Sequence, residues 1–215
     1  MAKRRKVSNM LALAVLSAVT MRPMHPYEMA TTLREHGKDQ DIKFKWGSLY
    51  TVVQNLEKHG FLKVVESGRQ GGRPERTVYR ITDAGREELL DWVRELMAVP
   101  EPEFPRFKAA LSVAGVIGPD EMMDLLRQRI VALEEQITEM RATMAAASAV
   151  PRLFLIEGEF DLALREAELA WVRSLLEELT NGTLPGLDAW RSYFRTGEMP
   201  PEFIVEGGAG TGKDI

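Results

Sequence analysis

The sequence predicts a mostly α-helical fold in two parts, and three observations predict it. Apolar residues recur at helical spacing through most of residues 9–97, interrupted by two strand-like runs around a segment rich in glycine and arginine. Pro100, Pro102 and Pro105 then mark a linker. Beyond it, residues 119–180 repeat apolar side chains at alternating intervals of three and four, which is typical of a coiled coil. The predicted parts are a first domain at 1–98, a linker with a connecting helix at 99–118, a helical domain at 119–204 and a disordered, glycine-rich tail at 205–215.

The composition limits the kind of protein that this chain is. It has 215 residues and is 45% hydrophobic, which is enough for the cores of two small domains. It has no cysteine, which excludes disulfides and thiolate metal sites and agrees with a cytoplasmic location. His25, His36 and His59 lie apart among polar residues, so no metal site is predicted. No apolar run reaches the ~18 residues that cross a bilayer, so no membrane contact is expected.

The first twenty residues have two interpretations. The basic residues 3–6 precede the apolar stretch 10–19, which resembles the charged and apolar regions of a secretion signal. No small-residue cleavage site follows, however, and the segment continues into residues 20–24. We therefore interpret residues 9–20 as a buried helix behind a basic arm, which is either a mobile contact for a polyanion or merely solvated. The apolar face of this helix is expected to consist of Met10, Leu13, Leu16 and Val19.

The net charge of −4 hides a division between the two parts of the chain. Residues 1–86 hold 16 lysines and arginines and 8 acidic residues, which gives +8. Residues 87–215 hold 12 basic and 24 acidic residues, which gives −12. This asymmetry indicates that the first part faces a polyanion, while the alternative is a chance partition of surface charge.

Two helices are predicted after the first one. The earlier of the two spans residues 26–36 and ends at Gly37. The later one begins near Gly47 or Ser48 and ends at Gly60. Its buried stripe is predicted to consist of Leu49, Val52, Val53 and Leu56. Its opposite, polar stripe consists of Ser48, Thr51, Gln54, Asn55 and Lys58.

This polar stripe carries the side chains that read double-stranded DNA. Asn and Gln can each form two hydrogen bonds with adenine, and Ser or Thr can bond bases or phosphates. A helix that is apolar inside and polar outside fits the major groove of DNA. Lys43 and Lys45 lie just before this helix, where they would contact phosphates. The alternative is an ordinary solvated helix face.

A β-hairpin follows, with strands predicted at 61–66 and 77–82. Its connecting segment holds Arg69, Arg73 and Arg76 among glycines. Glycines allow a close backbone approach and the arginines pair with phosphates, so the segment favours contact with a DNA backbone or minor groove. Three helices and this hairpin make a winged helix-turn-helix. A helix at 83–97 is expected to turn Leu89, Leu90, Val93 and Leu96 inward.

Three segments of the first domain also form a pattern in a fixed order. They are His25-Pro26-Tyr27-Glu28-Met29; Gly47-Ser48-Leu49-Tyr50 with Leu56-Glu57-Lys58-His59-Gly60-Phe61-Leu62; and Gly72-Arg73-Pro74 with Tyr79-Arg80-Ile81-Thr82 and Gly85. In this order they resemble the PadR family of bacterial transcription regulators, over about residues 9–97. The chain departs from the family at His25-Pro26, where many members have glycine, but proline suits a first helical turn. The second part resembles the longer, two-domain PadR class by architecture only.

The resemblance implies a repressor-like homodimer that binds double-stranded DNA. It places Tyr50 and the wing arginines at the DNA backbone, and it implies that C-terminal helices embrace the partner chain. Two winged helices on a twofold axis would read a pseudo-palindrome with half-sites about 34–36 Å apart or a multiple of that. The alternative function is a winged-helix module that makes only protein contacts. Such a module would be indifferent to Lys45, Gln54, Asn55 and Arg73.

The second part carries a heptad seam, which we define as Met123, Leu126, Ile130, Leu133, Ile137, Met140, Met144 and Ala147. A second long helix at about 153–180 repeats Leu162, Leu169, Val172, Leu176 and Leu179. A short helix around Trp190 and Phe194 is expected to fold back. The seam must be buried either against a partner chain or within a hairpin of one chain, and a dimer of hairpins satisfies both. The predicted dimer contacts are Met123, Leu126, Ile130, Leu133, Ile137, Met140, Leu169, Val172 and Leu176.

Two further features have competing interpretations. Six aromatic residues either line a pocket for a small aromatic effector between the two domains or simply belong to the core. They are Trp92, Phe104, Phe107, Phe154, Phe160 and Trp171. The segment Gly207–Asp214 resembles a phosphate-binding loop. Asp214 replaces the Mg²⁺-binding Ser or Thr, however, and no helix can follow, so neither a nucleotide, a cofactor nor an enzyme activity is predicted.

Overall fold

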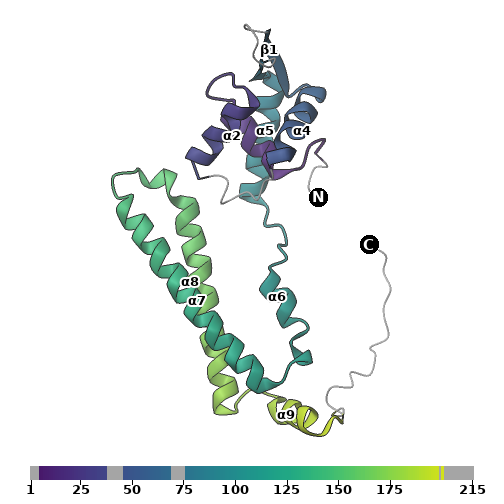
Figure 1. The fold of residues 1–215 in the computed structure, drawn as a ribbon, viewed down its shortest axis with the longest axis vertical. Coiled ribbons are helices and arrows are strands. Elements are labelled where there is room, and N and C mark those ends of the chain that lie inside the picture. The colour runs from purple at the N-terminus through teal and green to yellow at the C-terminus, as the bar shows by residue number, and fades with distance from the viewer. Residues whose placement is uncertain (1–4, 38–45, 69–75, 199, 201–215) are drawn as a thin grey trace. The chain divides into compact units, whose positions relative to one another are not determined.

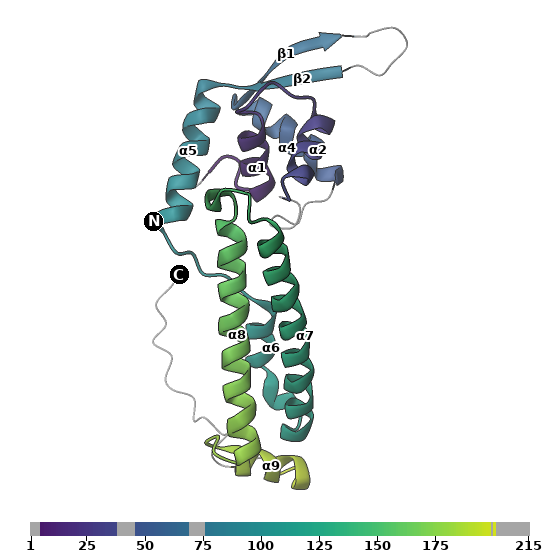
Figure 2. The ribbon, with the colours of Figure 1, turned by 90° about the vertical axis from the view of Figure 1, so that its left-hand side faces the viewer.

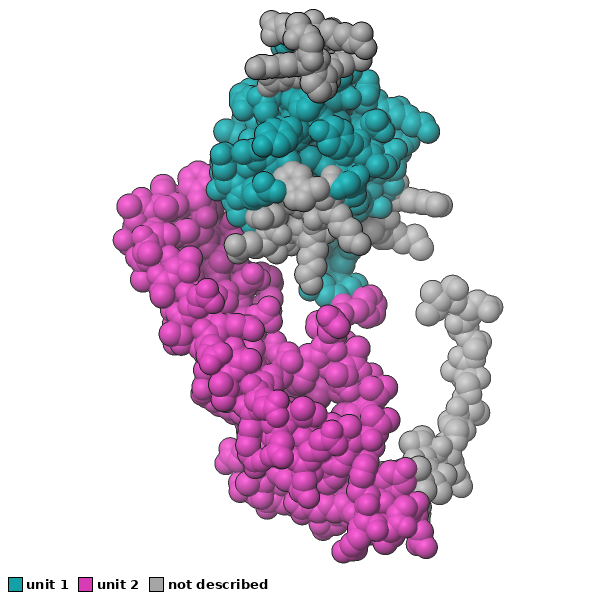
Figure 3. Space-filling view, in the orientation of Figure 1, with its two compact units in different colours: residues 1–103 teal, residues 104–215 magenta. Residues whose placement is uncertain are grey.

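The chain forms two compact units, residues 1–103 and 104–215 (Figure 3). The computed structural model describes residues 5–37, 46–68, 76–198 and 200. Each unit has its own cluster of buried apolar side chains, so each is described by itself.

The first unit contains helices and one β-hairpin (Figure 1). In chain order its elements are α1 (Met10–Ala18), α2 (Pro26–Glu35), α4 (Trp46–Lys58), β1 (Leu62–Gly68), β2 (Arg76–Ile81) and α5 (Asp83–Ala98). The two strands pair antiparallel, and Leu62 lies opposite Ile81 at the base of the hairpin. A bulge between Val64 and Glu66 shifts the register farther out.

Helix α1 is the centre of the first unit's core. It contacts α2, α4 and α5, and it buries side chains on almost every side. The predicted single apolar face is wrong, because Met10 is exposed and Leu13 is only half-buried, whereas Leu11 and Val15 are fully buried. The physical reason is that α2, α4 and α5 all pack against α1, so only the narrow side with Met10, Leu13 and Ser17 remains partly open to water.

Helix α5 turns two of the four predicted residues, Leu89 and Leu96, toward the core. Gly85, Leu89, Trp92 and Leu96 follow one another at intervals of four, three and four, and they turn inward. Leu90 and Val93 were expected inward, but they are 52% and 42% exposed. The two stripes are both apolar and lie side by side on the helix, so periodicity alone does not separate the buried stripe from the exposed one.

Arg5 is anchored on α5 and is not part of a mobile arm. Its side chain is only 4% exposed and donates to Glu88 at 2.7 Å and to Glu95, with Asp91 3.6 Å away. Its guanidinium lies over the ring of Trp92, 5.2 Å from the centroid. Burial opposes the charge, but the hydrogen bonds to Glu88 and Glu95 outweigh it and raise the pKa of Arg5. This corrects the prediction of a free basic arm at that residue.

The second unit is helical throughout its described part. Its elements are α6 (Arg106–Leu111), η1 (Ala114–Val116), α7 (Pro119–Ala146), η2 (Arg152–Phe154), α8 (Ile156–Asn181) and α9 (Leu187–Thr196). Helices α7 and α8 run antiparallel and side by side as a long hairpin (Figure 2). Helix α8 ends at Gly182, whose φ of +75° suits glycine.

The heptad seam closes this hairpin within one chain. Leu126, Leu133 and Ile137 of α7 are buried with Leu169 and Val172 of α8. The remaining predicted dimer contacts are partly buried in the same hairpin, namely Met123, Ile130, Met140 and Leu176. The fully buried residues of this set are therefore covered within their own chain, whereas contact of the four partly buried ones with a partner chain stays a prediction. The connection between α7 and α8 is short, so the antiparallel neighbour that covers the seam comes from the same chain.

The short helix α9 caps one end of the hairpin. Leu187 is buried in the hairpin's core, and the Nε1 of Trp190 donates to the carbonyl of Ile117 at 3.1 Å. The ring of Phe194 lies against Gly118, where an added Cβ would be 3.3 Å from the ring. This helix is the one expected around Trp190 and Phe194.

Candidate nucleic-acid interface

Helix α2 packs against α4, which carries the candidate interface. Its N-terminus is closed by a capping box, in which Nδ1 of His25 accepts from the amide of Tyr27 at 3.1 Å. The Glu28 carboxylate in turn accepts from the amide of His25 at 2.9 Å. This reciprocal pair satisfies backbone donors that a helix start leaves unpaired, so the helix begins at Pro26. The structure therefore explains why histidine and proline suit the place where glycine is frequent.

Helix α4 has one buried and one exposed side. Leu49, Val52, Val53 and Leu56 are all buried, as their spacing predicts, and the helix contacts α1 and α2 through them. Of the polar stripe, Thr51, Gln54, Asn55 and Lys58 are exposed, and Ser48 is half-buried. Tyr50 is also exposed. The structure thus brings six of the predicted DNA-binding residues together on one helix.

The exposed side of α4 is chemically available. The side chains of Gln54, Asn55 and Lys58 make no hydrogen bond or ion pair to any residue in the described ranges. Amide groups that are not tied to neighbours can form two hydrogen bonds to a base edge, and an untied ammonium can pair with a phosphate. Gln54, Asn55 and Lys58 are therefore available to a ligand without the loss of a hydrogen bond or ion pair within the described ranges.

The remaining predicted DNA contacts fall mostly beyond the described residues. Lys43, Lys45, Arg69 and Arg73 lie outside them. Arg76 is the first residue of β2, and its backbone pairs with Gly68 at the far end of the hairpin. Strand β2 therefore includes Arg76, which the sequence analysis placed in the connecting segment.

Thr82 joins three elements at the base of the wing. Its hydroxyl donates to the carbonyl of Gly60 at 2.6 Å and accepts from the amide of Gly85 at 3.0 Å. Its amide donates to the carbonyl of Phe61 at 3.0 Å. Gly60 adopts a φ of +76° just after α4, where glycine is favoured. One threonine thus fixes the end of α4, the base of the hairpin and the start of α5.

A second junction attaches the wing to the segment before α2. Met24 and Tyr79 exchange two backbone hydrogen bonds, both 3.0 Å long. Both side chains are buried. Burial, and then the negative charge of Glu57, raise the pKa of the Tyr79 hydroxyl, so this side chain is neutral at physiological pH. The wing is therefore held on both sides at a fixed angle to α4.

Sequence reasoning missed one cationic pair on the wing. Lys63 and Arg80 lie directly opposite each other on the two strands, and both are exposed. Like charges in this arrangement repel, so the pair adds positive potential at a cost in stability. The sequence alone does not identify this pair, because Lys63 and Arg80 become neighbours only once the register of the two strands is known.

The residues predicted to line an effector pocket do not share one environment. Trp92 belongs to the core of the first unit, where Arg5 covers its ring. In the second unit, Phe107 meets Trp171 edge to face with centroids 6.1 Å apart, and the Arg129 guanidinium lies 3.6 Å from the Phe107 centroid. Phe154 is 67% exposed. Only Phe107 and Trp171 are in contact, and Trp92 has no free ring surface for a ligand.

Two classes of site are absent from the described ranges. Within residues 5–37, 46–68 and 76–198, no helix is both long and apolar enough to cross a membrane. The same ranges contain no group of three or more His, Cys, Asp or Glu side chains that could hold a metal ion. The segment that resembles a phosphate-binding loop, 207–214, lies outside the described residues.

Comparisons with known proteins agree with this architecture. Residues 15–91 match the family described as "Transcriptional regulator PadR-like family". The "Negative transcriptional regulator PadR" of Bacillus subtilis (strain 168) is 23% identical over 146 residues, which are 67% of this chain and 79% of that protein. The crystal structure of Bacillus subtilis PadR in complex with operator DNA has a TM-score of 0.62 at 20% identity, over 80% of this chain and 99% of that one. The complex of the same protein with p-coumaric acid gives 0.65 at 18% identity, over 79% of this chain and 98% of that one.

These structures share the fold of this chain, a winged helix-turn-helix followed by a helical unit. The matched residues 15–91 run from α1 into α5, so they include α4 and the whole hairpin. Over this domain, the chain matches the PadR-like family of transcriptional regulators.

Proposed function

We propose that the chain is a sequence-specific DNA-binding repressor that binds a pseudo-palindromic operator as a homodimer. The observation that carries the proposal is the two-sided character of α4. Its inner side is buried, and its outer side offers Gln54, Asn55 and Lys58 with no competing contacts in the described part of the chain. A helix docked in this way on two others, with a hairpin beside it, suits insertion into the major groove.

Each exposed residue has a proposed role that follows from its chemistry. Gln54 and Asn55 read base edges, with Ser48 and Thr51 beside them. Lys58 and Tyr50 contact the phosphate backbone, which positions α4 without selecting a sequence. The cationic residues outside the described ranges are assigned to phosphates as well, namely Lys43, Lys45, Arg69 and Arg73.

The relatives support the regulatory part of the proposal. One relative carries the name of a negative transcriptional regulator, and a structure of similar fold was solved with operator DNA. We assign repression and operator binding to this chain on that basis. The domain roles follow, with residues 1–98 binding DNA, 99–118 linking and 119–204 forming the dimer.

The test is a DNA titration at several salt concentrations, with the region upstream of the chain's own gene. We expect tight binding that weakens steeply with salt, because phosphate contacts release counterions. Gln54→Ala should relax the sequence preference, whereas Lys58→Ala should weaken all sequences evenly and reduce the salt slope by about 1. Arg127→Ala removes the same charge from the exposed surface of α7 and should change neither property.

The same titration separates this function from a module for protein contacts alone. Such a module predicts no DNA affinity for the unaltered chain, or an affinity that is indifferent to Gln54 and Asn55. A flat salt response would also contradict the repressor proposal, since it would mean that no phosphates are contacted.

Release by a small aromatic effector is the finer part of the proposal. It is favoured by the contact between Phe107 and Trp171, beside which lies the Arg129 guanidinium. Arg129 already pairs with Glu168, so a ligand carboxylate would share or displace that pair. A protein of similar fold was solved with p-coumaric acid. Aromatic carboxylic acids should quench Trp171 fluorescence and release the operator, and an Arg129→Gln variant should respond less. Unchanged fluorescence and unchanged DNA binding across a panel of such acids would contradict this part alone.

A further inference from the structure

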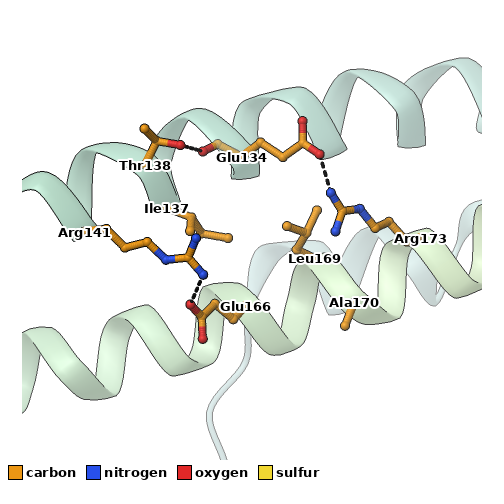
Figure 4. Close-up of a pocket in the computed structure, with 8 residues that line it drawn as sticks. All are labelled: Glu134, Ile137, Thr138, Arg141, Glu166, Leu169, Ala170 and Arg173. Carbon is orange, nitrogen blue, oxygen red and sulfur yellow. Dashed lines mark hydrogen bonds and ion pairs between the residues drawn. The ribbon is translucent and has the colours of Figure 1, made fainter.

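One side of the α7–α8 hairpin carries a shallow groove of about 340 Å³ (Figure 4). We call this side the charge-patterned face. It is defined by three residues from α7 and three from α8, namely Glu134, Thr138, Arg141, Glu166, Ala170 and Arg173.

Two ion pairs cross the groove, and the arginine belongs to α7 in one pair and to α8 in the other. Arg141 of α7 donates to Glu166 of α8 at 2.7 Å, whereas Arg173 of α8 donates to Glu134 of α7. On each helix the two charged residues are seven positions apart, so they lie on one side of it, two turns from each other. The four charges therefore occupy the corners of the groove with alternating sign, as Figure 4 shows.

This arrangement of charges is complementary to itself. A twofold axis that lies within the face, either along the helices or across them, turns each positive corner onto a negative corner of the second copy. Along the helices, Arg141 meets the second copy's Glu166, and across them it meets the second copy's Glu134. A symmetric dimer needs a surface that matches itself in this way.

The middle of the face permits close approach. Thr138 and Ala170 are exposed there and are small, and the apolar side chains of Ile137 and Leu169 lie buried beneath them. Helices approach more closely where the side chains between them are small. Two hairpins that met here would form a four-helix arrangement with the charged corners around its contact.

A second exposed surface fits a second copy less well. Ile156, Phe160 and Leu164 are exposed along α8 and form an apolar stripe outside the groove. Glu157 and Asp161 border this stripe, so pairing it with the same stripe of another copy would bring acidic residues together. Charge therefore favours the charge-patterned face for self-association.

We propose that the charge-patterned face binds the same face of a second copy of this chain. The inference rests on the homodimer of the proposed function and assigns that dimer a surface. The side chains that close the hairpin stay in their own chain, and the contact forms between the exposed corners of two complete hairpins.

The test uses two full-length variants whose charge-patterned faces carry opposite charge. Arg141→Glu with Arg173→Glu makes all four corners acidic, and Glu134→Arg with Glu166→Arg makes all four basic. By sedimentation, each variant alone should dimerise at least about 100-fold more weakly than the unaltered chain, because like charges face each other. An equimolar mixture should dimerise again, within about tenfold of the unaltered chain, because acidic corners then face basic ones.

Two further variants control for folding and for total charge. Glu135→Arg with Glu139→Arg makes the same charge change at exposed positions of α7 outside the face, and it should leave dimerisation unchanged. Ala170→Arg keeps both ion pairs but obstructs the centre of the face, and it should weaken dimerisation at least about tenfold. Circular dichroism should show the helix content of the unaltered chain in every variant; if the charge-reversed pairs unfold, Ala170→Arg decides the question.

The outcomes separate this inference from the function on which it rests. If the unaltered chain is monomeric at every concentration, the proposed homodimer is wrong. If it is dimeric and the two charge variants and Ala170→Arg dimerise as well as it does, the homodimer stands and this surface is wrong. Affinity for a single DNA half-site should be the same in all variants, since the exposed side of α4 is unaltered.

Discussion

Single residues decide how the β-hairpin meets helix α4. Thr82 bonds the end of α4 and the start of α5 at once, and Gly85 leaves the space that this contact needs. A Cβ on Gly85 would lie 2.2 Å from the carbonyl oxygen of Phe61, which is far inside van der Waals contact. The glycine is therefore required by a close backbone approach and not by an unusual φ.

Replacing Gly85 with alanine tests this close approach. We expect Gly85→Ala to lower the free energy of unfolding by about 1–3 kcal/mol, because the backbone of Phe61 must move away. The control is Gly47→Ala, where nothing lies within 4 Å of the added carbon and the change should be below about 1 kcal/mol. Urea unfolding would measure both, and equal effects of the two substitutions would contradict the close contact.

Arg5 shows what a sequence conceals at this scale. A basic N-terminal residue is normally solvated, and its burial depends on partners that lie more than 80 positions away. The signal that could have found it is on α5, where Glu88, Asp91 and Glu95 share one side with Trp92. Three carboxylates around an aromatic ring form a site for a guanidinium, but the sequence does not say which arginine fills it.

Removing Arg5 should be costly because its partners remain. In Arg5→Ala, Glu88 and Glu95 would lose the buried guanidinium that pairs with both of them, and the loss of one member of a buried pair costs about 3 kcal/mol. Arg22→Ala is the control, since that side chain is 56% exposed and lies 3.7 Å from Glu28, and such pairs contribute at most about 1 kcal/mol. Thermal unfolding of both variants checks this expectation, and a loss no larger for Arg5 than for Arg22 would show that the anchor is unimportant.

At the scale of elements, prediction succeeded where a helix has two distinct sides. The apolar and polar stripes of α4 are separated in sequence by regular spacing, so both its burial and its exposed residues followed from the pattern. Helix α1 offers no polar side and α5 offers two apolar ones, so the same method chose a wrong face for α1 and only half of the buried residues of α5. The seam of α7 was found at the right residues, but periodicity cannot say whether the covering helix belongs to the same chain.

The seam of the hairpin provides the test at this scale. Leu133→Ala should lower the free energy of unfolding of the second unit by about 2–5 kcal/mol, because Leu133 is buried between α7 and α8 and leaves a cavity. Val131→Ala, on the same helix but 54% exposed, should change it by at most about 0.5 kcal/mol. The measurement is urea unfolding monitored by circular dichroism. Equal losses in the two variants would mean that the seam is not the hairpin's core.

At the scale of the whole molecule, charge and architecture divide at nearly the same place. The positive part of the chain, residues 1–86, contains α4 and the wing, and the acidic remainder contains the long hairpin. The two units have separate cores, so DNA binding and assembly can be carried by different parts of one chain. Under the proposed function, the hairpin contributes to affinity by joining two DNA-binding units rather than by contacting DNA.

A comparison of the first unit with the full chain tests this division. On DNA with one half-site, residues 1–103 should bind about as tightly as the full chain, because both present the same α4. On DNA with two half-sites, the full chain should bind at least about 100-fold more tightly, because the second unit of a dimer binds at a high effective concentration. Insertion of about five base pairs between the half-sites, roughly half a helical turn, should abolish that advantage by turning one site to the far side of the duplex. Fluorescence anisotropy measures all of these affinities, and an advantage that survives the insertion would contradict a dimer with fixed spacing.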